Sequence, residues 1–352
     1  MQGMLSSFSS NVVLSKVRAM YGRRLTEEDY RNLLASRTVG QVTAYLKSRT
    51  VYGRVLAGVS ESTVYRSLLE EKLKRQLLEE SASLGRYEIT IGEHFARYFI
   101  QRAEIDEILR ILILLQAGRQ KDYFYHMPAY LAHHTHIDLT AFSRIRDYDG
   151  LLAALGQTEY RRILEPFRPK EGERIDYAAV ENALLVYLYG NVLQVIEKNT
   201  KGEARRQLFD IFASYADLTN YARIVRLKTF YRMEPDAIRR LLLPYGTIRK
   251  RLLAEMTTAE NAEGVRSVME RTSIGKRALK LNHSYAGELP RRMNFRNCRH
   301  YIYFSTHPSV VLISYILILQ VEISNIITIV EGVRYRLDPK EIESMLVKAG
   351  GQ

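Results

Sequence analysis

The chain has no tryptophan, a single cysteine and few residues that break helices. Because Cys298 is the only cysteine, no disulfide bond can form within the chain, and such usage is typical of a reducing compartment. Only 8 prolines and 20 glycines occur among 352 residues. So few helix-breaking residues favour an all-α fold, and the length predicts two or three domains.

The motifs of nucleotide-binding proteins and of common hydrolases are absent. The one Gly-Lys pair, Gly275-Lys276, precedes Arg277 and has no glycine five residues before it, so it is not a phosphate-binding loop. The patterns G-x-G-x-x-G, G-x-S-x-G and H-E-x-x-H do not occur. We therefore expect no catalytic residues and no bound cofactor, which leaves a small-molecule enzyme as the least supported class.

A long hydrophobic run free of charge is also missing. The most apolar stretch, residues 309–330, carries Glu322 in its second half, and a charge at mid-bilayer costs about 3 kcal/mol. The uncharged part is shorter than the roughly 20 residues that a spanning helix needs. Residues 1–20 lack a basic leader followed by a long apolar core. The sequence predicts a buried helix at 309–330, with no transmembrane segment and no signal peptide.

What the chain has in excess is positive charge: 52 Lys and Arg against 39 Asp and Glu give a formal charge of +13. This excess suits nucleic acid, anionic lipid headgroups or an acidic protein partner. The densest basic runs contain Arg223, Arg226, Lys228, Arg232, Arg239, Arg240, Arg249, Lys250 and Arg251, and then Arg291, Arg292, Arg296 and Arg299 with Phe295 among them. Interleaved basic and aromatic residues can bind RNA, but no RNA-binding motif accompanies them. Solvated helix faces are the simpler interpretation, and a docking face for acidic or membrane-apposed partners stays open.

One helical sequence pattern occurs three times, beginning at Ala103, Ala216 and Val321. The copies lie 113 and 105 residues apart. Each copy has an acidic residue in second place and then apolar residues at i, i+3, i+4 and i+7, which is the period of one helix face. A second recurring feature is the end of an amphipathic helix at Thr50, Thr158 and Thr272, followed by another helix. These spacings predict three helical units of about 110 residues.

Short segments with the same helix-start chemistry begin at Leu25, Met233 and Leu337, which are 208 and 104 residues apart. In each, an oxygen-bearing side chain precedes Glu or Pro, a combination that starts helices. We interpret the three segments as equivalent copies. The predicted domains are residues 1–122, 123–232 and 233–352, the last with a closing C-terminal hairpin. Solenoid repeats normally have about 20–45 residues, so three longer units favour a pseudo-threefold ring.

The acidic residues inside the repeated helix, Glu104, Asp217 and Glu322, have two interpretations. Each has a polar residue three positions later on the same helix face, and these are Glu107, Asn220 and Asn325. A proton or ion relay is one interpretation, but it needs a single route and not equivalent positions in three units. We therefore predict buried acceptors that satisfy nearby backbone donors or an arginine.

His126, His133, His134 and His136, with Asp138, form the densest group of candidate metal ligands. Zinc sites have a defined ligand spacing and a partner that orients each histidine, and neither is evident here. We predict a polar helix end and loop, with no metal site.

Five stretches of the chain, taken with the three-unit helical plan, resemble a known family. They are residues 14–53, 104–115, 136–155, 217–246 and 321–346. Their ordered set is similar to the C subunit of V-type and archaeal-type ATP synthases, a family that includes the d subunit of the eukaryotic vacuolar ATPase. The first repeat is less regular after Leu115 than the other two.

This resemblance implies a funnel of three similar helical domains without an active site. It also implies a place at the cytoplasmic face of a membrane, on the proteolipid ring, where the protein holds the foot of the central rotor stalk and couples ATP turnover to proton or sodium transport. The expected partners are the proteins of the central stalk, the proteolipid ring and, peripherally, the membrane surface. No nucleic acid or small-molecule substrate is expected. The alternative, a basic helical scaffold that binds nucleic acid, is favoured by charge alone.

Overall fold

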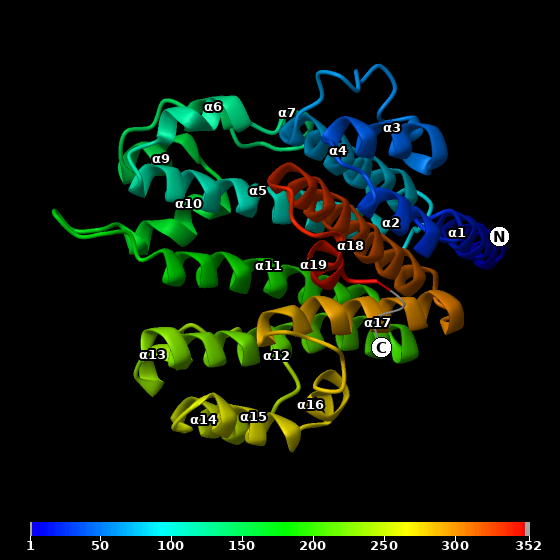
Figure 1. Ribbon diagram of the computed structural model, residues 1–352. Coiled ribbons are helices and arrows are strands. Elements are labelled where there is room, and N and C mark those ends of the chain that lie inside the picture. The colour runs from blue at the N-terminus through cyan, green and yellow to red at the C-terminus, as the bar shows by residue number, and fades with distance from the viewer. Residues whose placement is uncertain (1, 349–352) are drawn as a thin grey trace. The chain divides into compact units, whose positions relative to one another are not determined.

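The computed structural model describes residues 2–348, and Figure 1 shows that coiled ribbons account for most of this length. No strand occurs among the described residues, so the predicted all-α class is confirmed. By packing, the described chain forms two compact units, one of residues 2–96, 199–207 and 294–348 and the other of residues 97–198 and 208–293. The division into three domains and the pseudo-threefold arrangement stay predictions.

The α-helices are listed here in chain order. They are α1 (Gln2–Tyr21), α2 (Glu27–Leu34), α3 (Val39–Arg49), α4 (Arg66–Gly85), α5 (Gly92–Gln116), α6 (Tyr123–His126), α7 (Ala129–Ala132), α8 (Leu139–Phe142), α9 (Tyr148–Ala154), α10 (Glu159–Leu164), α11 (Tyr177–Asn199), α12 (Gly202–Tyr231), α13 (Pro235–Arg240), α14 (Lys250–Thr258), α15 (Ala262–Glu270), α16 (Ser273–Ala278), α17 (Leu289–Phe304), α18 (Pro308–Tyr335) and α19 (Pro339–Met345). Short 3₁₀ turns are η1 (Val51–Gly53), η2 (Gln120–Asp122), η3 (Glu165–Phe167) and η4 (Ala286–Glu288).

The first unit is built around α18, which packs against α4 and α1. Every residue of α18 from Ser309 to Leu319 is buried. A helix that is apolar on all sides belongs in an interior, and here the other helices of the unit supply that interior. Both α11 and α18 are long and apolar enough to span a bilayer, and 78% of the apolar window of α18 is buried within the protein. The predicted burial of residues 309–330 is confirmed.

The second unit pairs long helices with sets of short ones. One set, α13 to α16, packs on α12 and the start of α17 through an apolar core that includes Leu218, Ile238, Met256, Val265 and Ile274. The other set, α6 to α10, follows α5 in the chain and precedes α11. Each short helix is followed by a turn or loop, where the apolar helical period of the sequence stops.

Several predicted helix starts are confirmed in atomic detail. The Thr26 side chain accepts a hydrogen bond from the Asp29 N–H, and Asp29 caps Thr26 in return. Asp338 accepts from the Lys340 N–H ahead of Pro339. Glu234 also stands at a helix start, but its side chain makes no capping hydrogen bond.

The predicted equivalence of the segments at Leu25 and Leu337 is wrong. These segments form α2 and α19, which contact each other within the first unit, where Lys348 Nζ lies 3.1 Å from Glu27 Oε2. Glu322 of α18 accepts from the Leu25 N–H just ahead of α2. In the same way, Asp217 of α12 accepts from the Thr247 N–H just ahead of α14. By these contacts α2 corresponds to α14, whereas α19 follows α18 as α13 follows α12. The segments look alike because helix starts share the same capping chemistry wherever they occur.

Left-handed residues end three of the long helices, α5, α12 and α18. Gly118 follows α5 with φ of +66°, and Arg336 follows α18 with φ of +57°. In both places the next residue donates its N–H to a carbonyl five positions back, at Leu114 and Gly332, which is the Schellman pattern. Arg232, after α12, is also left-handed, with φ of +47°.

Candidate functional site

The three repeated carboxylates are buried hydrogen-bond acceptors, as predicted. Glu104 accepts from Thr135 Oγ1 and from the Tyr160 hydroxyl, each at 2.6 Å. Asp217 Oδ2 accepts from both the N–H and the hydroxyl of Thr247, each at 2.8 Å. Each carboxylate thus joins a long helix to residues of the short helices or loops that pack on it.

Glu322 makes the same kind of connection, but to partners from the other end of the chain. It accepts from the Tyr52 hydroxyl at 2.6 Å and from the Leu25 N–H at 2.9 Å. Tyr52 and Tyr160 each stand two residues after one of the recurring threonines, Thr50 and Thr158. The Thr-x-Tyr pattern therefore signals the partner of the carboxylate as well as the break between two helices.

We call each long helix with its repeated acid, together with the short helices and loops that the acid joins to it, a module. The module on α12 departs from the Thr-x-Tyr pattern. Two residues after Thr272 stands Ile274, which has no hydroxyl group, and the acid at the repeated position is the shorter Asp217. Asp217 is satisfied by Thr247 and by the Ile248 N–H at 3.2 Å. The shorter acid and the missing tyrosine are consistent with each other.

Asn220 and Asn325, which stand three positions after Asp217 and Glu322, make the same kind of contact as each other. Asn220 accepts from the Leu243 N–H at 2.8 Å and donates to the Leu243 carbonyl at 2.9 Å. Asn325 does the same with Val347, at 3.0 and 2.8 Å. One buried amide side chain therefore satisfies both backbone groups of a residue just beyond the following short helix.

The remaining module has an acid, Glu107, at this position. Glu107 lies 3.3 Å from Arg110 Nη1. Burial and the neighbouring Glu107 charge raise the pKa of the Tyr123 hydroxyl group. A carboxylate cannot donate a hydrogen bond to a backbone carbonyl as an amide does, and at this position Glu107 forms an ion pair with Arg110 instead.

Several charged and aromatic side chains surround Glu322. Burial raises the pKa of its carboxyl group, while Arg24, Tyr52 and the Leu25 N–H oppose this rise. The Arg24 guanidinium lies 3.5 Å from Glu322 and 3.9 Å from Glu80, and 5.6 Å from each of the Tyr52 and Tyr315 ring centres. Burial likewise raises the pKa of Asp217. Glu322 and Asp217 therefore have a structural role, as buried acceptors that hold helices and loops together.

The histidine group does not converge. His133, His134 and His136 are exposed, and among the described residues no three His, Cys, Asp or Glu side chains are placed to hold a metal ion. Asp138 instead caps α8, accepting from the Thr140 hydroxyl and from the Thr140 and Ala141 N–H groups, and these bonds lower its pKa. The His126 side chain lies outside the described residues.

The basic runs do not act as one surface either. Arg223 is buried, and its guanidinium donates to Asn182 and to the Leu241 carbonyl within the second unit. Arg292 pairs with Glu288 at 2.8 Å. Arginines that hold the fold together are not free to bind a polyanion, and this removes part of the charge on which a nucleic-acid interpretation depended.

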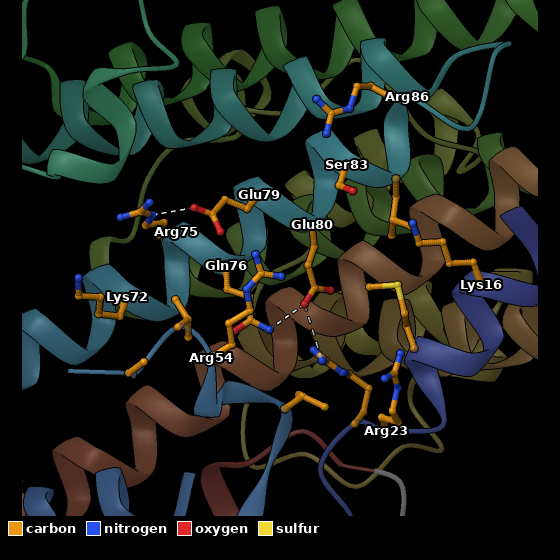
Figure 2. Close-up of a pocket in the computed structure, with 16 residues that line it drawn as sticks. Lys16, Arg23, Arg54, Lys72, Arg75, Gln76, Glu79, Glu80, Ser83 and Arg86 are labelled. Carbon is orange, nitrogen blue, oxygen red and sulfur yellow. Dashed lines mark hydrogen bonds and ion pairs between the residues drawn. The ribbon is translucent and has the colours of Figure 1, made fainter. Parts of the chain in front are cut away.

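A cavity of about 840 Å³ in the first unit is lined by many charged side chains, most of them basic (Figure 2). We call it the basic groove. It is lined by Lys16 and Met20 of α1, Arg23 and Arg24 after it, Val51, Arg54, Val55 and Ala57 in and after η1, and Lys72, Arg75, Gln76, Glu79, Glu80, Ser83, Leu84 and Arg86 in and after α4. Seven cationic side chains thus face two carboxylates. Sequence reasoning missed the groove because its residues come from three separate segments.

Both carboxylates of the basic groove are already engaged. Glu79 pairs with Arg75 at 2.7 Å. Glu80 accepts from Gln76 at 2.7 Å and from the Tyr315 hydroxyl at 2.6 Å. Within the described chain, the remaining cations, Lys16, Arg23, Arg54, Lys72 and Arg86, have no carboxylate partner. Lys16 alone has another contact, 4.0 Å above the Tyr87 ring.

Exposed aromatic side chains mark the left-handed helix ends. Phe230 and Tyr231 precede Arg232 with exposed fractions of 76% and 67%, and Tyr335 precedes Arg336 with 68%. Large exposed apolar side chains gathered beside a cation are typical of protein or membrane-surface contacts. We call these two places the aromatic ends.

Comparison with known proteins identifies the family of the chain. The family model described as ATP synthase (C/AC39) subunit matches residues 13–345. The chain is similar to the C subunit of the A-type ATP synthase of Pyrococcus horikoshii, with 22% identity over 94% of this chain and 88% of that protein. It is also similar to the protein of the same name from Pyrococcus abyssi, with 22% identity over 74% of this chain and 68% of that protein. The chain therefore belongs to the ATP synthase (C/AC39) subunit family.

Proposed function

We propose that this protein is a non-catalytic rotor adaptor of an A/V-type rotary ATPase. It would link the central stalk to the membrane proteolipid ring, at the cytoplasmic face of the membrane, and couple ATP turnover to proton or sodium transport. The observation that carries this proposal is the family match, which extends over residues 13–345. The two relatives are named as parts of an A-type ATP synthase, which assigns those proteins to the same class of machine.

The internal bonding suits a part that transmits torque. A torque-bearing adaptor must resist bending between its short helices and its long ones, because deformation would absorb the work of each step. Glu104, Asp217 and Glu322 fasten these elements through buried hydrogen bonds of 2.6–3.2 Å. Buried bonds exchange slowly with water and hold side chains in single positions.

The aromatic ends suit contact with the ring or with the headgroups around it. Tyrosine and arginine together favour the boundary between an apolar surface and anionic headgroups. A left-handed conformation is uncommon for arginine, and here a left-handed arginine follows both α12 and α18. We propose that the aromatic end of α18, in the first unit, faces the proteolipid ring.

Deletion of the chain tests the coupling role. In inverted membrane vesicles from the deletion strain, we expect ATP hydrolysis by the soluble head to continue while ATP-driven ion uptake is lost, and we expect the wild-type chain to restore uptake. Unchanged ion uptake would overturn the coupling role. Loss of hydrolysis by the isolated head would overturn its non-catalytic nature.

A point variant tests the aromatic ends. Tyr335→Ser removes an exposed ring, so the chain folds normally, but co-purification with the proteolipid ring is expected to fall about tenfold. Tyr65→Ser is the matched control, because Tyr65 is also exposed, at 61%, and lies at the start of α4. Equal retention of the ring by both variants would remove this end from the interface.

A further inference from the structure

We infer that the basic groove binds an acidic, amphipathic helix of another protein. The groove carries five cations without a carboxylate partner, from α1, from the segments after α1 and η1, and from α4 (Figure 2). Like charges that converge on one cavity repel each other, and an anionic partner relieves that repulsion. The chemistry of the groove therefore calls for negative charge from outside the chain.

The length of the groove selects the kind of anion. Lys72 of α4 and Arg86 just after it both line the groove, and they are 14 positions apart, which corresponds to about 21 Å along a helix. A single phosphate group cannot contact cations at both ends. A helix of about four turns spans the same distance and places acidic residues beside each cation in turn.

Its apolar lining points the same way. Met20, Val51, Val55, Ala57 and Leu84 line the groove between the cations. A free polyanion gains nothing from such side chains, whereas the apolar stripe of an amphipathic helix buries surface against them. A membrane surface is flat, so it meets the rim of a concave site and leaves the interior unfilled.

Arg24 gives the groove a fixed inner wall. Its side chain is only 7% exposed and is held by Glu322 and Glu80, so it keeps its position when the outer cations move. Its Nε and Nη1 atoms make no hydrogen bond within the described chain. The outer cations Arg23, Arg54 and Arg86 are exposed and free to adjust to a partner. A rigid wall with adaptable cations at the rim is a suitable cradle for a charged helix.

Peptide binding to the full chain tests the inference. The probes are a synthetic 18-residue helical peptide with Glu on one face and Leu on the other, and its counterpart with every Glu replaced by Gln. Fluorescence anisotropy is expected to show binding of the Glu peptide at least about tenfold tighter, weakening as salt rises from about 50 to about 300 mM. The double variant Arg23→Ala with Arg54→Ala is expected to bind it about 5- to 10-fold more weakly.

Arg37→Ala is the matched control, because Arg37 is an exposed arginine of the same unit outside the groove. Its affinity is expected to stay within about twofold of wild type. Thermal melts followed by circular dichroism confirm that all variants fold. Equal binding of the two peptides, or of the double variant and wild type, would overturn the inference.

Two further arms address other anions. If tripolyphosphate, or vesicles of phosphatidylglycerol in phosphatidylcholine, bind the groove and the Glu peptide does not, the groove is a phosphate or lipid site and the inference is wrong. If the Glu peptide binds and tripolyphosphate fails to displace it at equal charge, the inference is supported. Peptide binding is measured on the isolated chain, so its result is independent of the coupling assay in vesicles.

Discussion

Replacing Asn220 by alanine tests whether the amide contacts hold the modules together. Asn220 and Leu243 are 1% and 2% exposed, and their two hydrogen bonds measure 2.8 and 2.9 Å. Alanine leaves both the N–H and the carbonyl of Leu243 buried without a partner. Each unsatisfied buried group costs about 1–3 kcal/mol, so Asn220→Ala is expected to destabilise the second unit by about 3–5 kcal/mol.

Two measurements test the expected loss of stability in Asn220→Ala. Urea denaturation monitored by far-ultraviolet circular dichroism gives the free energy of unfolding. Hydrogen exchange at the Leu243 amide reports the local contact, and its protection is expected to fall by more than that of amides elsewhere in α12. Asn282→Ala serves as control, because Asn282 is exposed in the same unit, and a change within about 0.5 kcal/mol is expected there. A loss below about 1 kcal/mol for Asn220→Ala, with unchanged exchange at Leu243, would refute the reasoning.

Three further outcomes are expected from single substitutions. Tyr160→Phe removes one donor to buried Glu104 and is expected to lower the free energy of unfolding by about 1–3 kcal/mol, measured in urea; an unchanged midpoint would contradict the contact. The pKa of Asp217 is raised in the folded state, so its stabilising contribution is fully present below its usual pKa and is lost as pH rises through the raised value. The stability difference between wild type and Asp217→Asn is therefore expected to shift against wild type as pH increases from about 4, and the opposite slope would refute the sign. Arg336→Gly is expected to stabilise the protein by about 0.5–1 kcal/mol in thermal melts, because the left-handed position after α5 already carries Gly118; destabilisation would mean that the Arg336 side chain contributes contacts.

Local chemistry made much of the fold predictable. The apolar period of the segments at Ala103, Ala216 and Val321 gave the long helices, and the caps at Thr26 and Asp338 gave two helix starts. The buried role of the repeated acids also followed from the sequence, because a carboxylate on an apolar helix face needs a partner. These features depend on residues within a few positions of one another.

Features that depend on distant residues were not predictable. Glu322 meets Tyr52 and Leu25 across 270 and 297 positions of sequence, and no local pattern announces that meeting. The mistaken equivalence of the α2 and α19 segments has the same origin, because their different places in the unit depend on distant residues. The basic groove joins segments that share no motif. The left-handed Arg232 and Arg336 were not predicted because glycine is the usual signal for that conformation.

The contact between Glu322 and Tyr52 has a consequence for biosynthesis. Chains emerge from the ribosome at roughly 5–20 residues per second, so the 270 positions between these residues correspond to a delay of roughly 14–54 s. Throughout that interval Leu33 of α2 and Leu46 of α3, which are fully buried in the finished protein, lack α18, against which both helices pack. The N-terminal segment thus keeps apolar side chains exposed until the last long helix of its own unit has been made.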